Sequence, residues 1–165
     1  MKIQKIRAVK NPCRGTNLSA GIDFFVPDFS DTFISDLLEI NNFLRINTDK
    51  NVINLPPHKR ILIPSGIKVN FQGEPKVLIV FNKSGISVKK GLDALACVID
   101  QDYQGEIHFS LVNTSDEDVV INEGEKIVQM LMLPVLYENI QITDENIWNE
   151  KTERGEGGFG STGSH

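Results

Sequence analysis

The sequence predicts an all-β protein with a single domain, and three observations support this. Most of the chain consists of short apolar runs of strand length, separated by residues that form turns. Valine and isoleucine, which favour strands, are plentiful, whereas alanine, which favours helices, is scarce. A chain of 165 residues can bury a core in one domain without disulfides or metals. Many short strands at this spacing favour a sandwich, a jelly roll or a barrel.

The first pair of predicted strands lies in residues 59–71 (KRILIPSGIKVNF), where two extended pieces flank the turn-forming Pro64, Ser65 and Gly66. The next run, residues 76–81 (KVLIVF), is continuously apolar and of strand length. Such a run is typical of a strand that is buried on both faces, and we expect that arrangement here.

Two more strands are predicted further along the chain. In residues 106–113 the apolar side chains of Ile107, Phe109 and Leu111 alternate with polar ones, which predicts one buried face. Residues 126–136 (KIVQMLMLPVL) form another apolar run, which we expect to be a buried strand that ends at its proline.

One segment departs from the strand pattern. In residues 31–45 the apolar side chains recur at helical spacing, and Ser30 or Asp31 can cap such a helix. The apolar positions are Phe33, Leu37, Ile40 and Leu44. A helix of this length is marginal in isolation, so we expect it to pack on another surface. The asparagines that follow predict a polar loop: Asn41, Asn42, Asn47, Asn51 and Asn54.

The composition limits the classes of partner. A net charge of −5 at pH 7 argues against a general nucleic-acid binder but permits a small anionic substrate. The two cysteines, Cys13 and Cys97, form no disulfide framework or metal motif, which favours a reducing compartment. The charged N-terminal segment does not match a signal peptide, and no apolar run approaches the ~18–20 residues of a membrane span. We therefore expect a soluble, cytoplasmic protein that does not contact a membrane.

Asp100 is the first candidate for chemistry. It follows the apolar residues of a predicted strand end in VIDQDYQGE (98–106), where a carboxylate can be partly desolvated and well oriented. Those are the properties of a general base. Taken alone, the segment fits ordinary turn chemistry at least as well, because aspartate and glycine populate turns.

A second candidate is the Lys-Ser-Gly sequence at Lys83, Ser84 and Gly85, directly after the apolar run of 76–81. A cation, a hydroxyl and backbone N–H groups at a strand end can bind an anion, although an ordinary polar turn is the alternative. The longer glycine-rich pattern of a P-loop is missing.

Gln129 is the third candidate, because its amide lies within an otherwise apolar run. A buried amide without partners costs about 1–3 kcal/mol. Either a hydrogen-bond network in the core or a bound ligand can supply the partner. Lys126, three residues earlier, can share the same surroundings.

Five segments in order resemble the five sequence motifs of the trimeric dUTP pyrophosphatases. They are SAGIDF (19–24), NKSG (82–85), GLDALACVIDQDYQGE (91–106), GEKIVQ (124–129) and RGEGGFGSTG (154–163). The third and fifth motifs are long and specific. The other three are short and support the resemblance only in combination with them. Together the five span most of the chain.

The resemblance implies a jelly-roll-like β-clip protomer and a homotrimer whose active sites lie between subunits. It implies a β domain in residues 1–148, with an insertion at about 28–54, and a flexible C-terminal arm in residues 149–165. The implied reaction is hydrolysis of dUTP to dUMP and pyrophosphate. The implied cofactor is Mg²⁺, held through nucleotide phosphates and waters rather than by side chains.

The resemblance also implies roles for residues of the third motif. Asp100 matches the aspartate that activates a water for attack on the α-phosphorus. Tyr103 matches the tyrosine under the deoxyribose, whose ring leaves no room for a 2′-hydroxyl. Val98, Ile99 and His108 match the hairpin that binds uracil, largely through its main chain.

Asp23 matches a carboxylate that orients a basic neighbour, and the sequence leaves Arg154 and Lys83 open for that neighbour. The implied phosphate contacts in the β domain are Lys83, Ser84, Gly85 and Gln129. Lys83 and Lys126 stand where the family usually has arginine, so a point charge replaces a bidentate fork at both positions.

The arm carries the remaining implied contacts. Phe159 matches the ring that covers uracil, and Arg154 matches the cation that reaches the γ-phosphate. Gly160, Ser161 and Thr162 match the residues that hold phosphate oxygens. A glycine-rich segment with its own ligands suits a lid that closes over the nucleotide.

Two alternatives remain open beside a dUTP diphosphatase. One is a dCTP deaminase, or a bifunctional deaminase-diphosphatase, of the same fold. The other is a regulatory protein with the same β body that binds a protein partner through residues 31–45. On the diphosphatase reading, the helix predicted there packs away from the catalytic groups.

Overall fold

The computed structural model describes residues 1–47 and 51–157, and within them thirteen short strands and two helices form the fold. The largest sheet has the order β10-β8-β13-β3-β2. Its strands are β2 (Cys13–Arg14), β3 (Ile22–Phe25), β8 (Lys76–Asn82), β10 (Val98–Ile99) and β13 (Lys126–Pro134). β13, the longest, pairs antiparallel with both β3 and β8, so it places residues from three distant parts of the sequence side by side.

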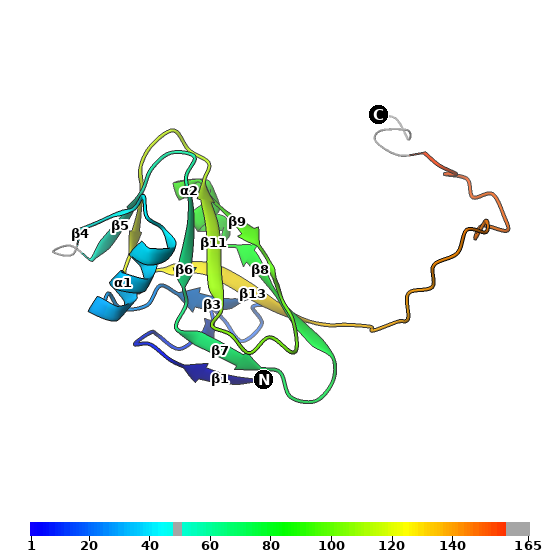
Figure 1. Ribbon diagram of the computed structural model, residues 1–165, viewed down its shortest axis with the longest axis horizontal. Helices are drawn as coiled ribbons and strands as arrows, with labels where there is room; N and C mark the ends of the chain where they lie inside the picture. Colours follow the sequence, from blue (N-terminus) through cyan, green and yellow to red (C-terminus); the bar gives the residue numbers. More distant parts are fainter. Residues whose placement is uncertain (48–50, 158–165) are drawn as a thin grey trace.

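Three smaller antiparallel sheets complete the body (Figure 1). One, in the order β6-β11-β9, consists of β6 (Arg60–Pro64), β9 (Leu92–Ala96) and β11 (His108–Asn113). Another, in the order β12-β5-β4, consists of β4 (Arg45–Asn47), β5 (Val52–Leu55) and β12 (Val119–Asn122). The last pairs β1 (Lys2–Lys5) with β7 (Ile67–Asn70). The all-β prediction is confirmed.

The core lies between the β6-β11-β9 sheet and the large sheet. Phe24 of β3 and Phe109 of β11 are both fully buried and meet edge to face, with ring centroids 6.3 Å apart. Ile107 and Leu111 are buried on the same side, whereas the alternate residues of β11 are only partly buried. The alternation predicted for 106–113 is therefore confirmed.

The strand at 76–81 is confirmed, but its predicted burial on both faces is wrong for this chain. Leu78 and Val80 of β8 are buried, whereas Phe81 is 44% exposed. The continuous apolar pattern reflects a second face of β8 that the described residues do not fully cover. The strand at 126–136 ends at Pro134 as predicted, and its C-terminal residues are likewise exposed.

The insertion forms a helix that is shorter than predicted. Helix α1 (Asp31–Ile40) is capped by Ser30, whose hydroxyl accepts a hydrogen bond from the Phe33 N–H at 3.3 Å. The helix ends at Asn41, whose side-chain amide donates to Leu37 O at 2.8 Å. Phe33 and Leu37 are fully buried, so α1 packs on its own chain.

The prediction of a polar loop in 41–54 is partly wrong. β4 and β5 form a hairpin across this segment, and β5 continues the sheet to β12. Ile53 and Leu55 of β5 are fully buried. Asn42 and Asn51 are exposed, and Asn51 adopts a positive φ of 49° in the turn, whereas Asn41 is buried.

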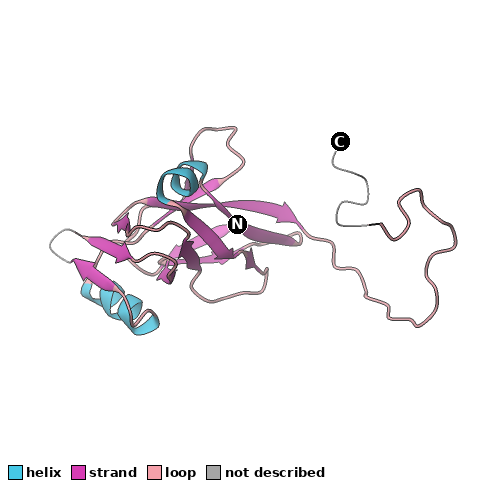
Figure 2. Cartoon of the chain, turned by 90° about the horizontal axis from the view of Figure 1, so that it is seen from above, coloured by secondary structure: helices cyan, strands magenta, loops and turns pink. Residues whose placement is uncertain are grey.

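The chain leaves the body after β13. Residues 135–157, called the arm segment here, contain no helix or strand and extend away from the sheets in both views (Figures 1 and 2). Its start is tied to the body, because Val135 N donates to Pro75 O at 3.1 Å. In the described part of the chain, neither helix is long and apolar enough to cross a membrane.

Candidate active site

A buried carboxylate with two ammonium groups forms the centre of the site. Asp23 of β3 is 5% exposed, and it forms an ion pair with Lys83 and a second with Lys126 at 3.0 Å. β13 brings these groups together because it begins at Lys126 and lies between β3 and β8. Of the two basic neighbours left open for Asp23, the structure thus places Lys83 against it.

The two lysines decide the charge state of Asp23. Burial alone would raise the pKa of this carboxyl, but hydrogen bonds and charge from Lys83 and Lys126 outweigh it and hold the pKa below its ordinary value. The same contact raises the pKa of Lys126. The cluster therefore carries one negative and two positive charges near neutral pH, which leaves one positive charge in excess.

Gln129 lies opposite Asp23 in the strand register, and its amide has found a protein partner. Its Nε2 donates to Asn82 O at 2.8 Å. Its Oε1 lies so near Gly21 that a Cβ there would approach within 2.2 Å, so a larger residue at position 21 would displace the Gln129 amide. The sequence left open whether the protein core or a ligand supplies the partner of this amide, and for one of its N–H groups the partner lies in the protein. The second N–H of the amide can still donate to a ligand.

Ser84 and Gly85 begin helix α2 (Ser84–Lys90), and both are exposed. The first backbone bonds of this turn come from Ile86 and Ser87, which donate to Lys83 O at 2.9 Å each. A helix leaves its earliest N–H groups without intrahelical acceptors. Lys83 itself is the N-cap, so the ammonium group and these N–H groups belong to one turn.

Asn82 is a residue that sequence reasoning missed. Its side chain donates to the Asp93 carboxylate and accepts from Ala94 N at 2.8 Å, while its carbonyl accepts from Gln129. It therefore ties β8 to both β9 and β13 beside the Asp23 cluster. A polar residue at the end of the apolar run 76–81 was the only signal for it in the sequence.

The second group of candidate residues lies on the connection between β9 and β11. β9 pairs with β11, but Val98 and Ile99 leave that pair and join β8 instead, opposite Ile79 and Leu78. The hairpin that contains Asp100 is therefore open at its tip. Val98 is 64% exposed and Ile99 is 8% exposed.

Asp100 is exposed in the structure of the single chain. The expectation of a partly desolvated carboxylate is therefore wrong for the single chain. Its backbone carbonyl accepts from Tyr103 N at 3.2 Å, as in a turn. In the described residues, no hydrogen bond or ion pair joins the Asp100 side chain to the Asp23 cluster. The strand end presents the carboxylate to solvent because none of the described residues covers it.

Tyr103 is held in a defined position by its neighbours. Its hydroxyl donates to Glu106 O at 2.8 Å, and its ring lies so close to Gly105 that an added Cβ would be 2.4 Å from the hydroxyl oxygen. His108 Nδ1 lies 2.9 Å from the same Glu106 carbonyl, which can only accept. Tyr103 is 43% exposed and lines an open cleft of about 810 Å³ with β1 and β7.

Arg154 lies in the arm segment, where its Nε donates to Gly157 O at 2.9 Å. The structure does not bring it to Asp23. Phe159, Gly160, Ser161 and Thr162 lie outside the described residues. Within the described residues, no group of three or more histidine, cysteine or acidic side chains is placed to hold a metal ion.

The fold is an antiparallel β body, and the Asp23 cluster gives it a site of net positive charge that suits a phosphate-bearing ligand. Comparison with known proteins identifies the protein family. The dUTPase family model matches residues 45–163, and the chain belongs to the dUTPase family.

Individual relatives agree with this assignment. The deoxyuridine 5′-triphosphate nucleotidohydrolase of Finegoldia magna is 41% identical over 122 residues, which cover 73% of this chain and 82% of that protein. The dUTPase of Staphylococcus bacteriophage 80α, solved with dUpNHpp, has a TM-score of 0.75 at 20% identity and covers 98% of this chain and 97% of its own. A mutant dUTPase from phage φ11 of S. aureus, described with a structural Mg(II) ion, has a TM-score of 0.67 at 18% identity, covering 87% and 96%. The jelly-roll-like fold of the dUTPases is thus the fold of this chain.

Proposed function

We propose that this protein hydrolyses dUTP to dUMP and pyrophosphate. Water attacks the α-phosphorus, and the bond from that phosphorus to the bridging oxygen breaks as pyrophosphate leaves. Within a dUTPase-family chain, the observation that carries the proposal is the Asp23 cluster, because it fixes two ammonium groups where a polyphosphate needs neutralisation.

The phosphates bind around the start of α2 and the Asp23 cluster in this proposal. Lys83 and Lys126 supply charge, and Asp23 holds both ammonium groups in place before the substrate arrives. Ser84 and Gly85 supply a hydroxyl and free N–H groups. Gln129 supplies the second hydrogen of its amide.

The nucleoside binds at the open hairpin. Val98, Ile99 and His108 would bind uracil, largely through backbone hydrogen bonds of the hairpin. Tyr103 forms the wall under the sugar, and its tether to Glu106 O keeps that wall rigid enough to exclude a 2′-hydroxyl. Asp100 takes the proton of the attacking water as general base.

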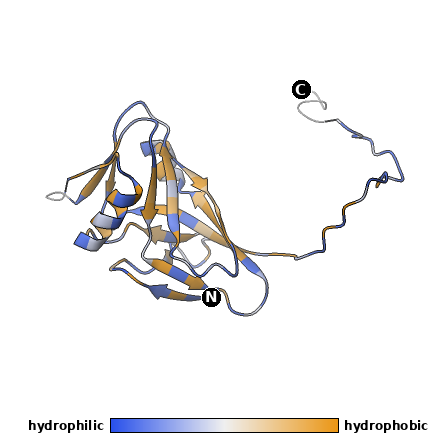
Figure 3. Ribbon diagram, viewed as in Figure 1, coloured by the Kyte–Doolittle hydropathy of each residue, from blue (hydrophilic) through white to orange (hydrophobic). Residues whose placement is uncertain are grey.

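The active unit is a homotrimer in which one chain completes the site of another. Asp100 is exposed here, yet a general base works best where water is limited, so its cover must come from elsewhere. The arm segment, which extends away from the body, also contains apolar residues (Figure 3), and large apolar side chains among them are exposed. They include Leu136, Tyr137, Ile140, Ile142, Ile147 and Trp148, each at least 68% exposed. Burial of these side chains on a second copy would stabilise the assembly.

Mg²⁺ is the proposed cofactor, bound through phosphate oxygens and water. The described side chains fit such a loosely held ion, because the Asp23 carboxylate is already occupied by two ammonium groups and Asp100 stands alone and exposed. When bound with the nucleotide, the ion supplies charge neutralisation for the triphosphate. The Mg(II) ion of the phage φ11 relative supports this choice.

Residues 149–165 are proposed as the catalytic part of the arm, and residues 1–148 as the domain that binds dUMP. Arg154 would bind the γ-phosphate, Phe159 would cover uracil, and Gly160, Ser161 and Thr162 would hold phosphate oxygens. Because the last strand ends at Pro134, the arm segment has enough chain to reach a neighbouring copy.

The decisive experiment measures pyrophosphate release from dUTP, dTTP, dCTP and UTP, with and without Mg²⁺. We expect release from dUTP alone at low substrate concentration, and dependence on Mg²⁺. Ammonia release from dCTP is measured in parallel. Ammonia without pyrophosphate would replace this proposal with a deaminase, and both products from dCTP would indicate the bifunctional enzyme.

A second role is favoured by the surface of the insertion. Leu38, Ile40 and Phe43 are 38–44% exposed beside α1, although all three are large and apolar. The phage 80α relative is described among phage dUTPases that control transfer of virulence genes, which supports a regulatory partner for this chain as well. A tagged protein should capture that partner, and Leu38→Ser with Phe43→Ser should abolish capture while Glu39→Gln retains it. Equal capture by all three forms would exclude the insertion as the binding surface.

A further inference from the structure

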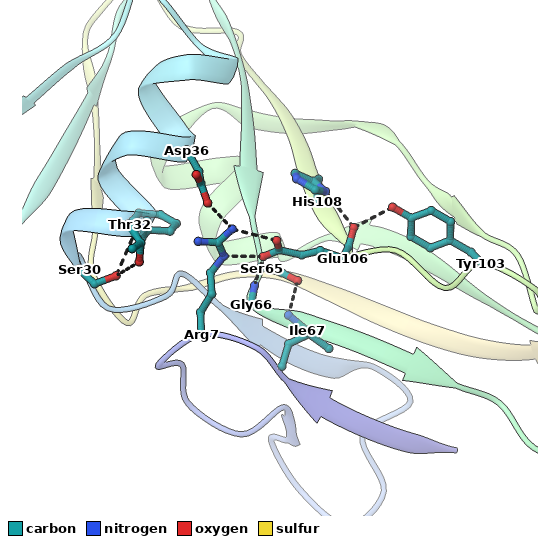
Figure 4. Close-up of polar contacts among 11 residues, drawn as sticks. Arg7, Ser30, Thr32, Asp36, Ser65, Gly66, Ile67, Tyr103, Glu106 and His108 are labelled. Atoms are coloured by element: carbon teal, nitrogen blue, oxygen red, sulfur yellow. Dashed lines mark hydrogen bonds and ion pairs between the residues drawn. The ribbon is translucent and has the colours of Figure 1, made fainter.

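The insertion helix is connected to the proposed nucleoside hairpin through one arginine (Figure 4). Arg7 Nη2 donates to Asp36 of α1 at 2.6 Å, and Arg7 Nε donates to Glu106 at 2.9 Å. A second hydrogen bond, from Arg7 Nη2 to Glu106, measures 3.1 Å, so the guanidinium binds that carboxylate in a bidentate contact. We call these three residues the Arg7 bridge. Helix α1 thus reaches the segment that contains Tyr103 through Arg7, while no hydrogen bond or ion pair among the described residues joins it to Asp23 or Asp100.

Glu106 connects the bridge to the site because its side chain and its backbone carbonyl bind different partners. Its side chain is fixed by Arg7 and by Gly66 N, which donates to it at 2.7 Å. Its backbone carbonyl accepts from the Tyr103 hydroxyl and contacts His108. A shift of the Glu106 side chain therefore moves the acceptor that holds the Tyr103 ring.

The contact between Arg7 and Glu106 is largely shielded from water, whereas the Asp36 end of the bridge is half exposed. The side chains of Arg7 and Glu106 are 16% and 11% exposed, whereas that of Asp36 is 44% exposed. Gly66, with a φ of +73°, lies against Arg7, and a Cβ there would approach the Arg7 Cβ to 3.0 Å. Charge-assisted bonds of this kind are stronger and more directional than neutral ones.

We propose that Arg7 is a positioning residue through which helix α1 sets the Tyr103 ring, and so the choice between deoxyribose and ribose. The proposal rests on the proposed function, which places Tyr103 under the sugar. Arg7 itself touches no reacting atom. Asp36 supplies the contribution of the insertion, because it binds Arg7 Nη2, the nitrogen that also donates to Glu106.

The best test changes Asp36 rather than Arg7. Removing Arg7 would leave the Glu106 carboxylate buried and without its cation, which can unfold the protein. Asp36→Asn keeps the Arg7–Glu106 contact and removes one charge from α1. Glu39→Gln is the matched control, because Glu39 is an exposed acid on the same helix and no hydrogen bond or ion pair is found for it among the described residues.

Kinetics on the full chain supply the first readout. Asp36→Asn should raise the UTP/dUTP ratio of kcat/KM by roughly three- to tenfold, the scale of the net contribution of one ordinary hydrogen bond, mainly through KM. In a Tyr103→Phe background the same substitution should change the ratio less than twofold, because the tether to Glu106 is already gone. Glu39→Gln should leave the ratio unchanged in both backgrounds. A merely structural ion pair would give equal effects of Asp36→Asn in both backgrounds.

Amide hydrogen exchange of residues 100–107 supplies a second readout that needs no turnover. Exchange should quicken in Asp36→Asn and stay at the wild-type rate in Glu39→Gln. If the wild type does not hydrolyse dUTP, the proposed function fails. The exchange rates of the two variants still show whether the Arg7 bridge holds residues 100–107 in place. Unchanged exchange in Asp36→Asn, or an unchanged UTP/dUTP ratio in an active enzyme, would overturn the positioning role.

Discussion

The Asp100 carboxylate is the residue on which the proposed chemistry depends most directly. Asp100→Asn should keep the fold and nucleotide binding, because the side chain is exposed and its removal leaves no buried group unpaired. The kcat for dUTP should fall about 10²–10⁴-fold, the usual cost of losing a general base.

The control for that substitution is Asp118→Asn, which removes an exposed acid that has no bond to the hairpin. It should leave kcat unchanged. Single-turnover assays with both variants, alongside dUMP titration, separate chemistry from binding. Turnover of Asp100→Asn within a few-fold of wild type would show that another group activates the water.

Asp23 gives the stability of the protein a dependence on pH. Because the folded-state pKa lies below the ordinary 3.8, its ionised form adds stability that is complete well above pH 3.8. That stability is lost as pH falls from about 3.8 through the folded pKa. The free energy of unfolding in urea should therefore show a larger advantage of wild type over Asp23→Asn at pH 6 than at pH 3. An advantage that does not change across this range would contradict the depressed pKa.

At the scale of elements, Asn41 joins the end of α1 to the body. Its buried amide donates to Leu37 O and to Leu62 O, and its Oδ1 accepts from Leu62 N at 2.8 Å. Asn41→Ala should lower the free energy of unfolding by about 1–3 kcal/mol, because backbone groups on α1 and β6 lose their partners in a buried place.

Asn42→Ala is the control for this element, since Asn42 is exposed and adjacent. Its effect should stay within about 0.5 kcal/mol. Urea denaturation of both variants measures the difference. Equal stabilities of the two variants would mean that the end of α1 is held by packing of Phe33 and Leu37 alone.

At the scale of the whole molecule, two truncations separate assembly from catalysis. Removal of residues 154–165 should leave the trimer and dUMP binding intact, while dUTP hydrolysis falls by orders of magnitude with the loss of Arg154 and the lid. Removal of residues 135–165 should also break the trimer, because it deletes the exposed apolar side chains of the arm segment.

Sedimentation velocity measures the size of each form, and titration with dUMP and a non-hydrolysable dUTP analogue measures binding. A trimer that survives the longer deletion would show that the sheets alone form the interface. An unchanged kcat after the shorter deletion would exclude a catalytic lid.

Sequence patterns predicted the features that depend on neighbours along the chain. Ser65 and Gly66 separate β6, which ends at Pro64, from β7 as expected, and Ser30 caps α1. Both follow from local chemistry, namely backbone preferences and a side chain within reach of the first turn. The order of the five motifs likewise indicated the dUTPase family before any contact was known.

The tertiary structure alone decided which distant residues meet. The sequence left two partners open for Asp23, and the pairing of β13 with β3 and β8 selected Lys83 and added Lys126. It gave no sign of the Arg7 bridge, whose members are up to 99 residues apart. Periodicity reports which face of a strand is apolar, whereas the contacts across that face depend on how strands pair and pack. The sequence therefore determined the family and the local elements, and the packing of β13, α1 and the hairpin decided the charges and contacts of the site.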